Sequence, residues 1–202
     1  MSGSILYIHG LNSAPGSMKA SQLQAVMEQL GLAAQLRVPA LHHHPREAIA
    51  QLEAAIAELG RPLLVGSSLG GHYATYLAER HGLKALLINP AVNPHQLFDG
   101  YLGTQTNHYT GETWELTHDH VQALAELEVA PPTDPARYQV WLQTGDETLD
   151  YRRAERYYRA CALRIEAGGD HSFQRFALHL PALLSVAGID PQAYQSLDFS
   201  VF

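Results

Sequence analysis

The sequence predicts an α/β fold, a parallel sheet of about six strands with helices on both faces. Short apolar runs alternate along the chain with longer segments whose apolar residues recur at helical spacing, which is the pattern of parallel α/β proteins. The chain has 202 residues, of which 46% are hydrophobic, and these values suit one domain with a sizeable core. We therefore treat residues 1–202 as a single domain.

Six short apolar segments are the expected strands, and turn-forming residues bound most of them. The second is the weakest candidate, whereas the fourth stops sharply at an Asn-Pro pair. In chain order the segments are Ile5–Ile8, Leu36–Val38, Leu63–Ser67, Ala85–Ile88, Val140–Gln143 and Leu163–Ile165.

Five segments have the spacing of amphipathic helices. Proline suits the first turn of a helix, so Pro45 marks a start, whereas Pro181 inside the last segment should kink or split it. The expected helices are Met18–Leu30, a helix from Pro45 closed by Gly60, Leu69 to about His81, about Tyr151 to Ala160, and about Phe173 to Val186.

One connection, between Ala91 and Arg137, is longer than the others and breaks this alternation. It has one clear helical pattern, Val121–Leu127, and a turn-like Thr110-Gly111 pair near several aromatic residues. Insertions of this length often carry function. We expect residues 92–137 to form a lid or a substrate wall, and a packed structural excursion is the equal alternative.

Charge and cysteine content exclude several classes of protein. The formal net charge is −7 and no basic run is present, which argues against binding to nucleic acid or to an anionic membrane. Cys161 is the only cysteine, so we expect a reducing compartment and a buried structural thiol. Neither an export signal nor a bilayer-spanning segment is recognisable, which favours a cytoplasmic protein without membrane insertion.

The third strand ends in Gly66-Ser67-Ser68-Leu69-Gly70, a Gly-x-Ser-x-Gly pattern followed at once by a helix. A strand that turns sharply into a helix holds the central serine exposed and strained, and the flanking glycines leave room for that turn. The pattern alone is short enough to occur by chance. Its place between a strand and a helix makes Ser68, and not Ser67, a candidate nucleophile.

A serine nucleophile needs a histidine base and a carboxylate that orients it, and in a parallel sheet these come from loops at the carboxyl ends of strands. Asp146 follows the fifth strand and His171 follows the sixth. Asp150 is better placed to cap the next helix, and Glu147 is a less favoured alternative. The chain order Ser68, Asp146, His171 is that of α/β-hydrolases.

Two backbone N–H groups should stabilise the oxyanion that forms when the serine attacks. We assign the amide of Leu69, next to the nucleophile, and the amide of Leu11, in the loop after the first strand. Gly10 would let that loop approach the serine closely. His9, in the same loop, is expected to be structural.

The remaining histidines are weaker candidates, because the chain has 12 of them. His72 follows the nucleophile and could lie near the site without acting as the base, and His179 should lie on a helix surface. The run His42–His44 should be loop surface, since adjacent side chains diverge and no cysteine or carboxylate cluster completes a metal site. We therefore expect no metal and no cofactor.

Six motifs extend from the first strand to the last helix: Tyr7–Ser13, Gly66–Gly71, Ile88–Ala91, Tyr109–Gly111, Gln143–Glu147 and Gly168–Phe173. Together they resemble the YqiA-type esterase family of small bacterial α/β-hydrolases. The resemblance implies a compact fold that lacks the first two strands of the full fold, with spatial strand order 2-1-3-4-5-6.

The same resemblance implies a serine esterase with Ser68, Asp146 and His171 as its triad and no cofactor. Its substrates would be small carboxylic esters, with acyl-CoA thioesters as a further class. An acyltransferase or a lyase could use the same three residues, and a non-catalytic binding protein could share the fold. These alternatives stay open from the sequence.

Overall fold

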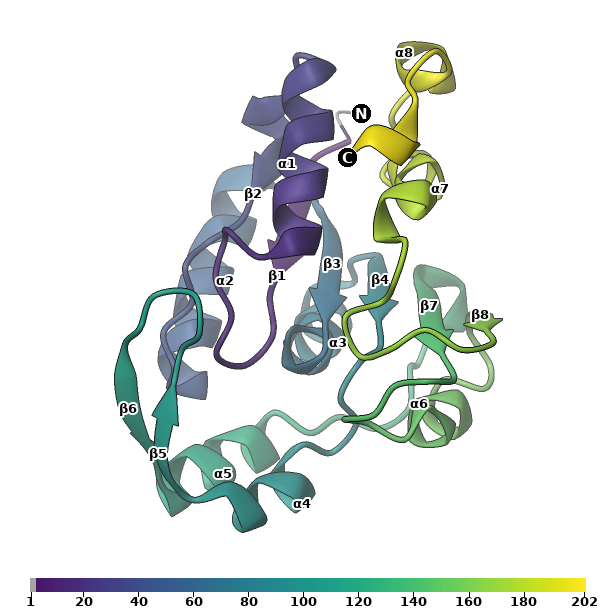
Figure 1. Cartoon of the computed structure of the whole chain (residues 1–202). Coiled ribbons are helices and arrows are strands. Elements are labelled where there is room, and N and C mark those ends of the chain that lie inside the picture. Colours follow the sequence, from purple (N-terminus) through teal and green to yellow (C-terminus); the bar gives the residue numbers. More distant parts are fainter. Residues whose placement is uncertain (1–2) are drawn as a thin grey trace.

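The computed structural model describes residues 3–202. Met1 and Ser2, which belong to the segment for which no export signal is predicted, lie outside the described residues. Its main sheet has six parallel strands in the order β2-β1-β3-β4-β7-β8 (Figure 1). The predicted α/β fold is confirmed. The predicted strand order 2-1-3-4-5-6 is also confirmed, because β5 and β6 form a separate sheet in the insertion, so β7 and β8 are the fifth and sixth strands of the main sheet. The bounds are β1 Ile5–Ile8, β2 Leu36–Arg37, β3 Leu63–Ser67, β4 Ala85–Ile88, β7 Tyr138–Gln143 and β8 Ala162–Glu166.

Helices cover both faces of this sheet (Figure 1). The main ones are α1 (Met18–Gln29), α2 (Pro45–Leu59), α3 (Leu69–His81), α6 (Tyr151–Tyr157), α7 (Leu180–Val186) and α8 (Pro191–Tyr194), and short 3-10 turns cover Ala33–Gln35, Phe176–His179 and Phe199–Val201. Within residues 3–202, none of the helices combines the length and the apolar composition that a bilayer crossing requires.

The predicted final helix, Phe173–Val186, is wrong in its first part. Phe173 and Arg175 have positive φ angles of 62° and 59°, which an α-helix does not accommodate. A 3-10 turn follows, and Pro181 then lies in the first turn of α7, where its missing N–H costs no hydrogen bond. The proline therefore splits the segment, as the sequence predicts.

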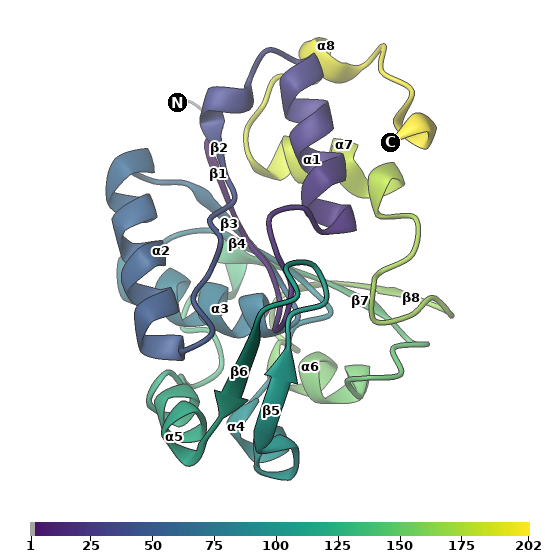
Figure 2. The ribbon, with the colours of Figure 1, turned by 60° about the vertical axis from the view of Figure 1, so that its left-hand side comes forward.

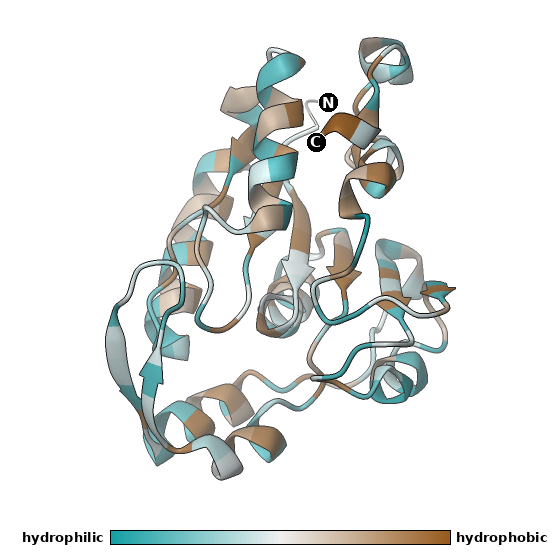
Figure 3. Ribbon diagram, viewed as in Figure 1, coloured by the Kyte–Doolittle hydropathy of each residue, from teal (hydrophilic) through white to brown (hydrophobic). Residues whose placement is uncertain are grey.

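Alternate residues of each strand supply two separate hydrophobic layers. Tyr7 and Val65 pack beneath α1 and α7, whereas Leu6 and Leu64 pack beneath α2 and α3. Figure 3 shows the apolar colouring concentrated on the strands and on the helix faces around them. Because both faces of the sheet are covered, the ends of the strands are where side chains can meet a ligand.

The insertion at 92–137 contains more structure than its sequence indicates. Helix α5 confirms the helical pattern at 121–127, but the antiparallel hairpin β5-β6 was not predicted. In Figure 2 this hairpin stands in front of the sheet. The elements are α4 (His95–Phe98), a 3-10 turn at Asp99–Tyr101, β5 (Gly103–Thr106), β6 (Thr113–Leu116), α5 (His118–Glu126) and a 3-10 turn at Pro135–Arg137.

Three glycines let the start of α3 approach the neighbouring strands very closely. A Cβ atom added to Gly70 would lie 2.0 Å from the Ile8 carbonyl oxygen, and one added to Gly66 would lie 2.4 Å from the Gly70 carbonyl oxygen. At Gly71 the added atom would lie 2.5 Å from Cβ of Pro90. Rigid backbone surrounds the first two positions, so no side chain can be accommodated without moving β1 or α3.

We expect Gly70→Ala to lower the free energy of unfolding by at least about 2 kcal/mol, because overpacking against rigid backbone forces the chain to shift. Gly16→Ala is the matched control, since no atom lies within 4 Å of its added Cβ. Its effect should stay within about 0.5 kcal/mol. Urea denaturation measures both, and equal stability of the two variants would contradict the close approach.

His72, on α3, is buried against the insertion. Its Nε2 atom donates a hydrogen bond to the Leu124 carbonyl of α5 at 3.2 Å, and the residue is 6% exposed. Burial disfavours the charged imidazolium, and this effect lowers the pKa of His72 to about 4. The unfolded chain should bind the same proton near pH 6.5.

Acid should therefore destabilise the fold through His72, because between about pH 6.5 and 4 the unfolded state takes up a proton that the folded state does not. This loss should approach roughly 3 kcal/mol at pH 4. His72→Gln keeps an N–H donor for Leu124 but cannot titrate. Its free energy of unfolding, measured in urea at each pH, should fall less steeply, and parallel curves for the two proteins would refute this.

Candidate active site

The three predicted site residues come from loops after three different strands. Ser68 follows β3, Asp146 follows β7 and His171 follows β8. Because these strands are parallel, their carboxyl ends meet at the same edge of the sheet. The structure brings all three side chains together there.

Ser68 has an unusual backbone conformation, with φ 55° and ψ −121°, at the residue just before α3. Such angles are strained for a residue other than glycine and persist only where neighbours impose them. Here the Ser68 N–H donates to the Ile88 carbonyl at 3.1 Å, and its own carbonyl accepts from the amides of Gly71 and Ala91, both at 2.9 Å. The sharp turn is therefore held on both sides of the serine.

A continuous set of hydrogen bonds links the three side chains. His171 Nε2 lies 2.9 Å from Ser68 Oγ, and His171 Nδ1 lies 2.8 Å from Asp146 Oδ2. The Asp146 side chain is 2% exposed, and its Oδ1 atom accepts from the amides of Thr148 and Leu149 at 2.9 and 2.8 Å. A carboxylate fixed in this way favours the proton on Nδ1, which leaves Nε2 to accept from the serine hydroxyl.

Two buried polar side chains, which sequence reasoning did not assign to the site, hold the loop that carries His171. The Gln143 side-chain oxygen accepts from the amides of Asp170 and Gln174 at 3.3 and 2.8 Å. Asn89 accepts from the Gln143 amide at 2.9 Å and donates to the Asp170 carbonyl at 3.0 Å. The sequence does contain an indication of this role, because Asn89 directly follows the apolar strand β4 and Gln143 ends the apolar strand β7. Polar side chains in such buried positions are usually hydrogen-bonded.

The two competing carboxylates have other partners. Glu147 Oε2 accepts from the backbone N–H of His171 at 3.0 Å, so it supports the loop and not the imidazole ring. Asp150 Oδ1 accepts from the Arg152 amide at 3.1 Å, which confirms its predicted role as the cap of α6.

The two predicted oxyanion donors belong to the start of α3 and to the loop after β1. Leu69 is the first residue of α3, so its N–H has no acceptor within the helix. The loop after β1 packs directly against Ser68, because a Cβ added to Gly10 would lie 3.2 Å from Ser68 Cβ. Leu11 follows in that loop and lines the same cavity as Ser68.

This cavity has a volume of about 360 Å³, which is the size of a small-ligand site. Its wall includes Ser68 and His171, the loop after β1, the start of α1, and His108 and Tyr109 from the hairpin turn. The insertion therefore contributes directly to the cavity that Ser68 lines.

The hairpin is tied to the loop after β1 by three hydrogen bonds. Trp114 Nε1 donates to Asn12 Oδ1 at 2.9 Å, and Asn12 Nδ2 donates to Gln105 Oε1 at 3.3 Å. Asn107 Nδ2 donates to the Ser13 carbonyl at 2.9 Å. In Figure 2 the turn of the hairpin accordingly lies beside the loop between β1 and α1.

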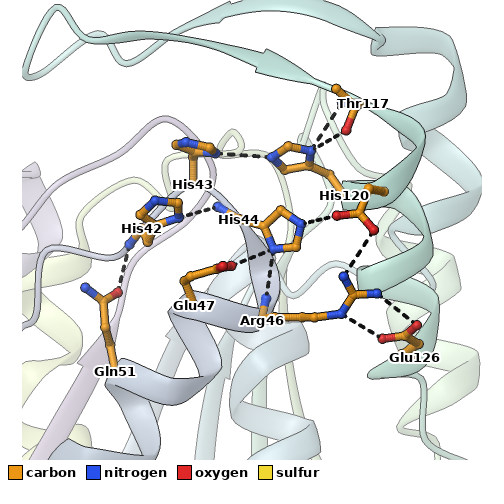
Figure 4. A network of polar contacts seen from close by, with 10 residues as sticks. His42, His43, His44, Arg46, Glu47, Gln51, Thr117, His120 and Glu126 are labelled. Carbon is orange, nitrogen blue, oxygen red and sulfur yellow. Dashed lines mark hydrogen bonds and ion pairs between the residues drawn. The ribbon is translucent and has the colours of Figure 1, made fainter.

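The histidine run before α2 is not simple loop surface, so that expectation is wrong for two of its members. Figure 4 shows His44 between Glu47 and α5: its ring nitrogens lie 2.7 Å from Glu47 Oε2 and 2.8 Å from Asp119 Oδ2. His43 Nδ1 lies 3.1 Å from His120 Nε2. These contacts join α2 to the insertion. Over residues 3–202, no group of three or more His, Cys, Asp or Glu side chains could hold a metal ion.

Two further histidines are structural. His9 Nδ1 lies 3.0 Å from the Gly10 carbonyl, and its Nε2 accepts from the Leu41 amide at 3.3 Å, so the structural role predicted for His9 is confirmed. The prediction that His179 lies on a helix surface is wrong. It is 6% exposed and packs against Trp141 and Phe173, because the chain enters α7 only after this residue.

His72 lines a different small cavity from Ser68, so it does not join the three site residues. Cys161 is half-buried, not fully buried as predicted, and burial raises the pKa of its thiol to about 11. At neutral pH the thiol stays protonated and is a poor nucleophile.

Comparison with known proteins places this geometry in a family. The family model described as "Uncharacterised protein family (UPF0227)" matches residues 4–188. A UPF0227 protein from Shewanella woodyi is 33% identical over 188 residues, which cover 89% of this chain and 96% of that protein.

Solved structures share the fold at low sequence identity. Mouse alpha/beta hydrolase domain-containing protein 10 is 16% identical, with a TM-score of 0.69 over 95% of this chain and 90% of that chain. Est1E from Butyrivibrio proteoclasticus, solved with ferulic acid bound, is also 16% identical, with a TM-score of 0.64 over 91% of this chain and 85% of that one. These likenesses confirm the α/β-hydrolase fold, and the chain belongs to the UPF0227 family, the YqiA-like family that its motifs resemble.

Proposed function

We propose that the protein is a serine esterase that hydrolyses small carboxylic esters and, by the family resemblance, acyl-CoA thioesters. The observation that carries the proposal is the hydrogen-bonded series from Asp146 through His171 to Ser68, at a strained turn that opens into a cavity. A protein that only binds a ligand does not need a serine, a histidine and an aspartate aligned in this way. The hydrogen-bonded series therefore argues against the non-catalytic alternative.

The proposed reaction has two steps. Ser68 Oγ attacks the ester carbonyl while His171 Nε2 takes the hydroxyl proton, and Asp146 stabilises the imidazolium that forms. The tetrahedral intermediate collapses when His171 returns the proton to the departing alcohol, which leaves an acyl group on Ser68. Water, deprotonated by the same histidine, then releases the carboxylic acid and regenerates the serine.

In this proposal the amides of Leu69 and Leu11 bind the oxyanion in both steps. Such donors act because they are aligned before charge develops, and removing one typically costs about 3–4 kcal/mol of transition-state stabilisation. The Leu11 amide lies on a loop, so its alignment depends on what holds that loop. The hydrogen bond from Trp114 to the adjacent Asn12 supplies such support.

An acyltransferase would share the first step and differ in the acceptor of the acyl group. Ferulic acid, a carboxylic acid, is bound in the Est1E structure, and this supports carboxylic ester chemistry on the shared fold. Adding methanol to the ester assay separates the two functions. An esterase should form mainly free acid in dilute methanol, whereas an acyltransferase should form mainly the methyl ester.

Ser68→Ala should reduce the enzyme-dependent turnover of p-nitrophenyl butyrate by at least about 10³-fold, because the acyl-enzyme cannot form. A fluorophosphonate probe should label the wild-type protein at Ser68 alone, as peptide mass spectrometry would show. Ser67→Ala is the matched control and should still be labelled. Full activity of the Ser68→Ala protein would overturn the assignment.

Trp114→Phe should lower kcat about fivefold with little change in KM, since one neutral hydrogen bond contributes about 1 kcal/mol. The variant leaves Asn12 without its donor, and Asn12→Ala should give a similar loss that does not add to the first. Thr113→Ala, at an exposed position of the same strand, should behave like wild type. Additive losses in the double variant would show that the two side chains act independently.

A further inference from the structure

One wall of the catalytic cavity comes from the start of α1 and has no part in the proposed mechanism. Ser17, Met18 and Lys19 line this wall, in the same cavity as Ser68. Ser17 occupies the capping position of α1, yet its side chain makes no capping hydrogen bond. The residue is 8% exposed, and within residues 3–202 its hydroxyl has no hydrogen-bond partner.

The partial positive charge at the N-terminus of α1, beside Ser17, is not compensated by a side chain of the first turn. The first N–H groups of a helix lack acceptors within it and carry a partial positive charge. Most helix starts offset this with a capping side chain or an acidic residue. Helix α1 is 12 residues long and has neither a side-chain cap nor an acidic residue in its first turn. Its free amides therefore favour an anion at the cavity wall.

Lys19 adds a full positive charge at the same place. Its Nζ atom donates one hydrogen bond, to the Ser172 carbonyl at 2.7 Å, so two of its three N–H donors remain for another partner. Within residues 3–202 no carboxylate forms an ion pair with it, but the charges of Asp170 and Asp146 act on it from further away and favour its charged form. Burial lowers the pKa of Lys19 to about 8, so the ammonium still predominates at neutral pH.

A purely supporting role for Lys19, holding the loop next to His171, would explain its bond to Ser172. That role does not involve Ser17, which lines the cavity and whose hydroxyl has no partner within residues 3–202, nor does it involve the uncapped end of α1. Glu147 lines the same cavity, and the hydrogen bond that it accepts from the His171 amide offsets part of its negative charge. On a chain with a net charge of −7, these unpaired donors on one cavity wall favour an anionic ligand.

We propose that Ser17, the first amides of α1 and Lys19 form a subsite for an oxyanion carried by the substrate, a carboxylate or a phosphate, so that the enzyme prefers anionic esters. The inference rests on the proposed esterase function and names its substrate class. The anion could belong to the acyl part or to the leaving group, and the two positions require separate tests.

The test compares charged and neutral esters of matched shape. The p-nitrophenyl monoester of adipic acid against its methylated form places the charge on the acyl part. The pair 4-acetoxybenzoate and methyl 4-acetoxybenzoate places it on the leaving group. We expect kcat/KM of the wild type to favour the charged member of at least one pair by about tenfold, because hydrogen bonds to a charged group are stronger than neutral ones.

Lys19→Met should abolish this preference, so that kcat/KM falls at least about tenfold more for the charged esters than for the neutral ones, and Ser17→Ala should reduce the preference partially. Lys84→Met is the matched control, because Lys84 is the only other lysine and is exposed. Lys19→Glu should reverse the preference, a result that a merely structural lysine would not give.

The outcomes separate the two proposals. Hydrolysis of neutral esters with no charge preference in either pair overturns the oxyanion subsite and leaves the esterase intact. Equal losses on charged and neutral esters in Lys19→Met also overturn the subsite, because they would show that Lys19 only supports the loop at Ser172. Absence of hydrolysis for all four compounds overturns both proposals.

Discussion

The close contact between the start of α3 and the end of β1 is the constraint on which the rest of the site depends. Gly70 lies against the Ile8 carbonyl with no room for a side chain. This contact brings the loop after β1 close to Ser68, so that Gly10 packs against Ser68 and Leu11 lines the same cavity. A wider spacing of the two elements would separate the two proposed oxyanion donors from each other.

The loop that carries His171 is held by two amide side chains, Gln143 and Asn89, that are buried among the apolar strands. Gln143 is 1% exposed and Asn89 is 2% exposed. Gln143 accepts from the Gln174 amide and Asn89 donates to the Asp170 carbonyl, both in the segment that carries His171, and Asn89 also accepts from the Gln143 amide at the end of β7. Buried amides are costly unless they are fully hydrogen-bonded. This cost makes alternative positions of the loop unfavourable and keeps the imidazole between its two partners.

Most of the sheet could be predicted from sequence because buried parallel strands are short apolar runs with sharp ends. Ser68, Asp146 and His171 could be located for the same reason, since each follows such a run. The hairpin β5-β6 was missed because only Trp114 and Leu116 alternate with exposed residues, too short a pattern to recognise. His179 and His44 were misplaced because their burial depends on partners distant in sequence, Trp141 and Asp119.

The hairpin β5-β6 also limits how mutations can change the residues that line the cavity. An isolated two-stranded hairpin is marginally stable, and this one is bonded to Asn12 and Ser13 beside the proposed oxyanion loop. Its turn also supplies His108 and Tyr109 to the cavity wall. Mutations that reshape the wall for a new ligand therefore also disturb the loop beneath it, so ligand selectivity and turnover cannot evolve independently through this segment.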